Sequence, residues 1–178
     1  RAEVALRAHV AALPVDHPDR AGHEAWLHGD GALTLHSDPP GARVRLLRCV
    51  LRGRRLHEEP AGELGQTPLL AVPLPRGSYV CEITAPGRHP VRYPVLIGRG
   101  HHWDGVPPGA RASQPVRLPR AGQVGPGGCF MPAGWFRCGG AGDESLPDRM
   151  LWCGDRVVSR FHVTNADYIE FLDDLVGQ

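Results

Sequence analysis

The chain has 178 residues, with 20 basic and 19 acidic side chains and a formal net charge of +1. This length accommodates one ordinary domain or two small ones, and the balanced charge excludes a general attraction to nucleic acid or to membranes. No stretch approaches the roughly 18 consecutive apolar residues of a membrane-spanning helix, and no secretory signal pattern opens the chain. We therefore expect a soluble chain without a transmembrane segment.

Five cysteines stand far apart and form no Cys-x-x-Cys pair. Neither a disulfide framework nor a zinc site is supported by this spacing, so reduced cysteines and a cytoplasmic location are the expectation. The first residue is Arg1 rather than Met, and we expect the chain to be a piece of a longer polypeptide.

Two short helices are predicted at the start. In 2–13, Leu6, Val10 and Leu13 fall at i, i+4 and i+7, and Pro14 stops the pattern. The second helix is predicted over 16–28, with Asp16 as its cap and Gly29 at its exit. We interpret 1–29 as a helical linker.

Residues 31–46 show two alternating patterns around a turn at 38–41. Leu33 and Leu35 alternate with smaller or polar residues before the turn, and Val44 and Leu46 alternate with arginines after it. This pattern predicts two half-buried strands joined as a β-hairpin.

Further short strands are predicted over 67–74, 79–84 and 91–97, separated by turns rich in proline and glycine. Pro73 and Pro94 lie inside two of these patterns, which places both strands at sheet edges. The fold class is thus mainly β, with a small antiparallel β-sandwich over 30–104.

The segment 105–128 contains eleven glycines and prolines and is predicted to be a linker with one short strand at 116–118. In 129–178 we expect strands at 130–136 and 151–161, a loop at 141–145, and a final helix capped by Thr164 with Asp167 in a capping box. Its apolar stripe is Tyr168, Phe171, Leu172 and Leu175. We expect this truncated α+β segment to be the less stable part.

Several motifs in order resemble the PEGA domain family. They are the Gly-Ala-Leu-Thr-Leu of 31–35, the Ser-Asp-Pro-Pro-Gly-Ala-Arg-Val of 37–44, the Leu-Gly-Gln-Thr-Pro-Leu of 64–69, the Leu-Pro-Arg-Gly-Ser-Tyr of 74–79 and the Ala-Pro-Gly of 85–87. Pro40 stands where the family's eponymous turn has Glu. The resemblance implies a β-sandwich that acts as a spacer or a recognition module.

Residues 129–178 resemble the start of a formylglycine-generating-enzyme (sulfatase-modifying factor) domain. The resemblance rests on Met-Pro-Ala-Gly-Trp-Phe at 131–136, Gly-Gly at 139–140 and Val-Thr-Asn-Ala-Asp-Tyr-Ile-Glu-Phe at 163–171. His162 replaces an acid common in that family. Complete enzymes of this type use a cysteine pair and copper near the far end of the domain, which we expect this chain to lack.

Six arginines between Arg43 and Arg55 could form a phosphate-binding surface, because guanidinium groups match phosphate oxygens. We favour a solvated charged face, because Glu58, Glu59 and Glu63 follow closely and no aromatic residues are interleaved. Nucleic-acid binding is therefore not favoured.

Three other sets of residues could take part in chemistry or could serve only to stabilise the fold. His101, His102 and Asp104 are metal-ligand types, but adjacent strand residues point to opposite faces, and strand-end polarity around a packed Trp103 is preferred. Cys138 and Cys153 could form a redox pair or be small packing residues. Thr164 and Asn165 could lie near a site, but a helix cap is simpler.

No nucleophile triad, phosphate loop or zinc-helix motif occurs in the sequence, so no catalytic, cofactor-binding or metal-binding residue is assigned. The resemblances imply a non-catalytic part of a bacterial multidomain signalling protein, a serine/threonine kinase fused to PEGA and sulfatase-modifying-factor domains. Its partners would be the flanking domains and a protein partner. The alternative is a scaffold part of a metal-dependent oxidoreductase that makes formylglycine from cysteine.

Overall fold

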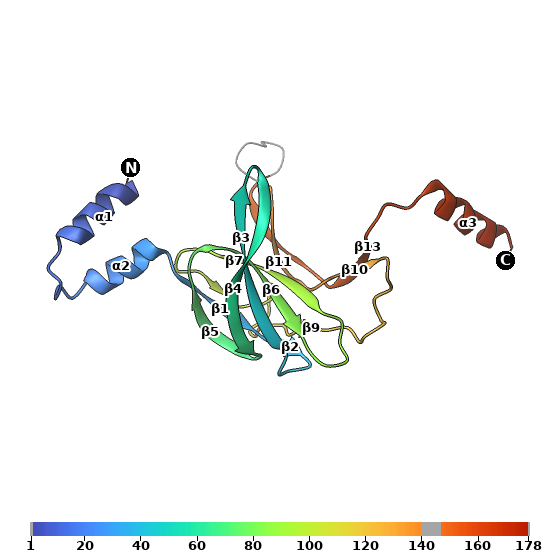
Figure 1. Cartoon of the computed structure of the whole chain (residues 1–178), viewed down its shortest axis with the longest axis horizontal. Coiled ribbons are helices and arrows are strands. Elements are labelled where there is room, and N and C mark those ends of the chain that lie inside the picture. The colour runs from blue at the N-terminus through green and yellow to red at the C-terminus, as the bar shows by residue number, and fades with distance from the viewer. Residues whose placement is uncertain (1, 140–146, 178) are drawn as a thin grey trace.

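A computed structural model describes residues 2–139 and 147–177. The chain is mainly β, with several small antiparallel sheets, short N-terminal helices and a C-terminal helix (Figure 1), as the sequence predicts. The elements are α1 (Ala2–Ala12), α2 (Arg20–His28), β1 (Gly31–Leu35), β2 (Ser37–Asp38), β3 (Arg43–Arg52), β4 (Arg55–Gln66), β5 (Leu69–Leu74), β6 (Gly77–Thr84), β7 (Val91–Ile97), β8 (His102–Trp103), β9 (Val116–Arg117), β10 (Gly128–Met131), β11 (Gly134–Cys138), β12 (Arg149–Cys153), β13 (Arg156–Ser159) and α3 (Asn165–Val176). The predicted loop at 141–145 lies outside the described residues.

Two sheets form the body of the molecule. One has the strand order β5-β1-β8 and the other the order β4-β3-β6-β7. Alternate side chains of both sheets are buried in one apolar cluster, including Leu33 of β1, Val44 of β3 and Ile83 of β6. Because each strand sends every second side chain to the same face, this burial is that of a β-sandwich.

The two strands that contain prolines lie at sheet edges, as predicted. Pro73 belongs to β5 and Pro94 to β7, and each strand ends its sheet. A proline has no N–H to donate, so an edge position avoids the loss of a ladder hydrogen bond.

The predicted hairpin at 31–46 is wrong, although its alternation is right. Leu33, Leu35, Val44 and Leu46 are all buried. However, β1 pairs with β5 and β8, whereas β3 pairs with β4 and β6. The turn between them therefore carries the chain from one sheet to the other.

Buried hydroxyl groups hold this crossing in place. The Ser37 Oγ–H donates to the Pro39 carbonyl at 2.7 Å, and the Ser37 and Thr67 hydroxyl oxygens are 2.5 Å apart. The Thr67 hydroxyl in turn accepts the Ala42 N–H at 3.0 Å. Since the Ser37 proton is already committed, the Thr67 hydroxyl donates to Ser37, and the two turns are linked by a directed chain of hydrogen bonds.

The segment 105–128 packs against the sandwich. Val116, Leu118 and Val124 belong to the same buried cluster as the strands. The predicted short strand is present as β9, which pairs in parallel with β2, and the Leu118 N–H donates to the Asp38 carbonyl at 2.8 Å. A domain boundary here stays a prediction, but the segment contributes side chains to the core.

The helices lie at the two ends of the molecule (Figure 1). α1 covers nearly the predicted range, whereas α2 begins at Arg20 rather than near Asp16. The start differs because 14–19 form their own turn, in which the His17 N–H donates to the Pro14 carbonyl. Gly29 ends α2 with a φ of +75°, as predicted for a helix exit.

The C-terminal segment consists of two strand pairs and a helix. β10 pairs with β13 and β11 with β12, which confirms the expected strands. α3 stands away from the sheets (Figure 1), and its stripe of Tyr168, Phe171, Leu172 and Leu175 is exposed, as anticipated.

Candidate functional site

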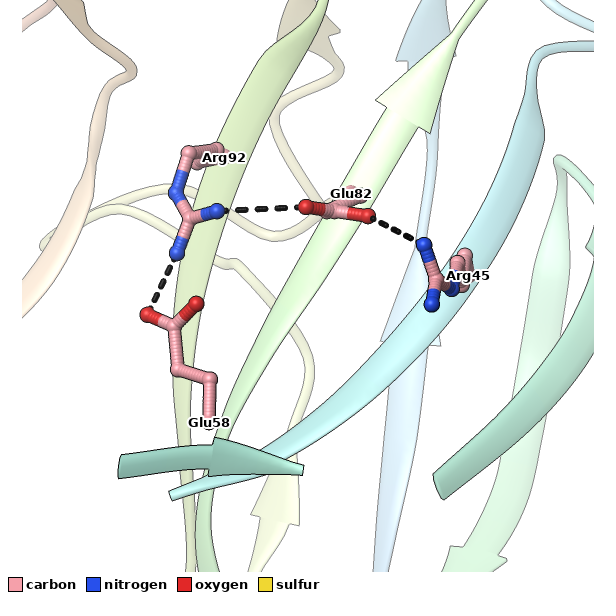
Figure 2. Close-up of polar contacts among 4 residues, drawn as sticks. All are labelled: Arg45, Glu58, Glu82 and Arg92. Atoms are coloured by element: carbon pink, nitrogen blue, oxygen red, sulfur yellow. Dashed lines mark hydrogen bonds and ion pairs between the residues drawn. The ribbon is translucent and has the colours of Figure 1, made fainter. Parts of the chain in front are cut away.

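A row of charges crosses the outer face of the four-stranded sheet (Figure 2). The Glu82 carboxylate lies between two arginines: its Oε2 is 3.4 Å from Arg45 Nη1, and its Oε1 is 3.1 Å from Arg92 Nη1. The other terminal nitrogen of Arg92 pairs with Glu58 of β4. We call Arg45, Glu82, Arg92 and Glu58 the charge ladder.

The ladder follows from strand alternation. Arg45, Glu82 and Arg92 belong to three neighbouring strands, and the register places Arg45 opposite Glu82 and Glu82 opposite Arg92. Opposite charges at such cross-strand positions attract one another. The hydrogen bond to Glu58 is the main cause that raises the pKa of the Arg92 guanidinium. This contact therefore stabilises the positive charge of Arg92.

The arginines of 43–55 divide into two groups. Arg45 pairs with Glu82 and Arg52 with Glu59. Arg54 and Arg55, at the end of the β3–β4 hairpin, have no acidic partner within 2–139 and 147–177. Arg43 and Arg48, exposed residues of β3, also have no acidic partner in those ranges, so the sheet carries both paired and unpaired arginines and is a solvated charged face, as favoured from sequence.

His101, His102 and Asp104 line one cavity of about 370 Å³, but within 2–139 and 147–177 they do not form a group that could hold a metal ion. The His102 Nε2 is 2.8 Å from the Thr34 hydroxyl, whereas the His101 ring packs edge-on to Trp103. The Asp104 carboxylate accepts the Val106 N–H at 3.0 Å. His102 and Asp104 thus have local hydrogen-bond partners and His101 has a ring contact, which agrees with the preferred structural interpretation.

Cys138 and Cys153 are not brought together. They lie in paired strands, but Cys138 is opposite Arg149 and Cys153 is opposite Gly134. The two cysteines are therefore about four residues apart along the strand direction, which corresponds to roughly 13 Å. The proximity that a redox pair requires is absent. Burial raises the pKa of the Cys81 thiol to about 12, which keeps that side chain protonated and inert.

The copper implied by the second resemblance has no matching ligand set in the part of the chain that the structure describes. A protein copper site needs several converging nitrogen or sulfur ligands. No three His, Cys, Asp or Glu side chains gather within 2–139 and 147–177. These residues do not fit a copper ion.

Thr164 and Asn165 start α3. The Thr164 hydroxyl accepts the Asp167 N–H at 3.2 Å, and the Asp167 carboxylate accepts the Thr164 N–H at 2.8 Å. This is the predicted capping box. The Thr164 hydroxyl also donates to the Asp167 carboxylate at 2.7 Å, and this bond, together with the one from the Thr164 N–H, lowers the pKa of Asp167.

Sequence reasoning missed a cavity of about 620 Å³ beside edge strand β7. Tyr93, Phe130 and Trp135 are among the residues that line it. The Trp135 indole N–H donates to the Val106 carbonyl at 3.0 Å, and a Cβ on Gly134 would approach the Tyr93 ring to 3.1 Å. Close packing of β11 on β7 shapes this cavity, and no residue pattern within either strand signals it.

No helix within the described ranges is long and apolar enough to cross a membrane. No family model matches the chain, and neither a curated protein nor a solved structure matches it.

The capping box predicts a response of α3 to acid. Asp167 has a lowered pKa when folded, so its contribution to helix stability is present above the ordinary value of 3.8 and is lost as pH falls through the folded value. NMR Cα shifts of α3 should lose helical character as pH falls below about 4. Asp167→Asn should flatten this transition, and Asp174→Asn should not. An equal acid response in Asp167→Asn would contradict the capping role.

The charge ladder predicts a response to polyanions. Glu58→Gln/Glu82→Gln would release Arg45 and Arg92 to bind phosphate, so affinity for a single-stranded oligonucleotide at low salt should rise. The slope of log affinity against log salt should steepen by about 1.4. Glu170→Gln/Asp174→Asn on α3 removes the same charge at a distance. An equal rise in that control would show that net charge alone is responsible.

Proposed function

We propose that the chain is a non-catalytic part of a bacterial multidomain signalling protein, in which a PEGA-like sandwich is the spacer between larger parts. The observation that carries this proposal is the contact between two of the motifs behind the resemblance. Ser37, from the Ser-Asp-Pro-Pro-Gly-Ala turn, and Thr67, from the Gly-Gln-Thr-Pro turn, share a buried hydrogen bond. Residues 30 positions apart in sequence thus act as one structural unit.

The proposed parent is a cytoplasmic serine/threonine kinase fused to the sandwich and to a sulfatase-modifying-factor domain. Strands β10 to β13 followed by the capped α3 agree with the strand-then-helix order of that domain's start. In a more specific version of this proposal, the sandwich also binds a protein partner. The catalytic groups of the parent would lie in its other parts.

Two assays test the proposal. This chain alone, incubated with ATP and a protein substrate, or with copper, oxygen and a cysteine-containing peptide, should form neither phosphoprotein nor formylglycine. The full-length parent should phosphorylate the protein substrate. Product formation by this chain alone would overturn the non-catalytic role, and a parent without phosphate transfer would overturn the kinase assignment.

Because 105–128 contributes to the sandwich core, replacing 30–128 in the parent with an unrelated sandwich of similar span distinguishes a spacing role from a recognition role. Unchanged parent activity is the result expected of a spacer. Loss of activity, with both flanking parts still folded, would contradict spacing and favour recognition.

A further inference from the structure

The end of the β3–β4 hairpin extends beyond the sheet that supports its base. Strand β6 accompanies β3 only as far as the Cys49–Ser78 pair, whereas β3 and β4 continue to pair with each other up to Arg52 and Arg55. Figure 1 shows this hairpin rising above the body of the molecule. We call residues 50–57 the hairpin tip.

The hairpin tip combines exposed apolar surface with positive charge. Leu51 and Leu56 are directly opposite each other, and each is 70% exposed. By strand alternation Arg52 and Arg55 project from the opposite face of the hairpin, and Arg54 lies in the turn between them. The range 50–57 contains no acidic residue. Isolated exposed leucines are ordinary, but a cross-strand pair at a projecting end is a contiguous apolar patch without a partner.

The backbone of the hairpin tip gives a second, independent observation. Gly53 and Arg54 both have positive φ, at +53° and +66°, which is the backbone of a two-residue type I′ turn. Glycine or asparagine is favoured at such positions, and a side chain like that of Arg54 is unfavourable there. In addition, Arg55 lies opposite Arg52, an arrangement in which like charges repel.

An anionic partner would offset the repulsion between these like charges. Arg52 is paired with Glu59, which leaves the charges of Arg54 and Arg55 at the outermost point. Elsewhere on the same sheet, Arg45 and Arg92 are matched by acids. The hairpin tip therefore combines its exposed leucines with two arginines, Arg54 and Arg55, that have no acidic partner in the described ranges.

We propose that the hairpin tip docks on an anionic lipid surface. Leu51 and Leu56 would enter the boundary between headgroups and acyl chains, while the arginine stems keep their guanidinium groups at the level of the lipid phosphates. Nucleic acid fits less well, because the hairpin tip has no aromatic ring on which a base could stack and its two leucines would gain nothing there. This inference does not depend on the proposed parent.

Co-sedimentation of the chain with vesicles tests the proposal. The chain should bind vesicles of phosphatidylcholine mixed with phosphatidylserine, and bind pure phosphatidylcholine far less. Leu51→Thr/Leu56→Thr retains strand-forming side chains and should lower the partition coefficient about tenfold. Arg54→Asn/Arg55→Gln should lower it by a similar factor, about tenfold, and weaken its salt dependence.

Matched controls separate the hairpin tip from general effects. Leu70→Thr removes a leucine of β5 that is 67% exposed, and Arg43→Gln/Arg111→Gln removes two exposed arginines elsewhere. Both should change the partition coefficient by less than about twofold. Far-UV circular dichroism should show every variant folded.

Three outcomes would overturn the proposal. They are equal binding to both vesicle types, no vesicle binding by the unaltered chain, and tip variants that bind as the controls do. Retardation of an oligonucleotide that the arginine variant abolishes, without vesicle binding, would assign the hairpin tip to nucleic acid instead.

Discussion

The hydroxyl contact between Ser37 and Thr67 lies where the chain passes from one sheet of the sandwich to the other. Thr67 is buried between β4 and β5, and its hydroxyl, carbonyl and N–H groups all bond to the turn at 37–42. Buried polar groups are costly unless they are paired, and here each partner satisfies the other. This junction links the two sheets at the place where the chain passes between them.

The rest of the body is arranged around that junction. β2 leads into it and also pairs with β9, so the segment 105–128 is attached to the core at the same place. Leu118 and Pro119 are among the fully buried side chains. The chain therefore returns to the junction after the last strand of the sandwich, before it forms β10 to β13.

In the described ranges, some surface arginines form ion pairs with acidic side chains and others do not. The charge ladder pairs Arg45 and Arg92 of the sheet face with acids. At the end of the hairpin, Arg54 and Arg55 have no such pairing in the described ranges. We propose a spacer whose hairpin tip is its point of contact with an anionic surface.

Sequence reasoning succeeded where a feature is local. The strand alternations, the edge prolines and the Thr164 cap each depend on a few adjacent residues, and each is confirmed. It failed where a segment's hydrogen-bonding partner is distant in the sequence. Nothing in 31–46 indicates that β1 and β3 join different sheets, because the hydrogen bonds that decide it come from Thr67.

Two other features were beyond local patterns. β4 has no apolar alternation, because it is an edge strand with two register shifts and mostly exposed side chains. The many glycines and prolines of 105–128 suggested a linker, yet its few apolar side chains reach the core. The charge ladder required the register of three strands, and the cavity beside β7 required the packing of β11.

Equilibrium unfolding in urea of the Thr67→Val variant tests the central role of the junction most directly. This change keeps the shape of the side chain but removes the acceptor for the Ala42 N–H and the donor to Ser37. We expect the free energy of unfolding to fall by about 1–3 kcal/mol, whereas Thr84→Val, at an exposed position of β6, should change it by less than about 0.5 kcal/mol. Equal stability of the two variants would contradict the account.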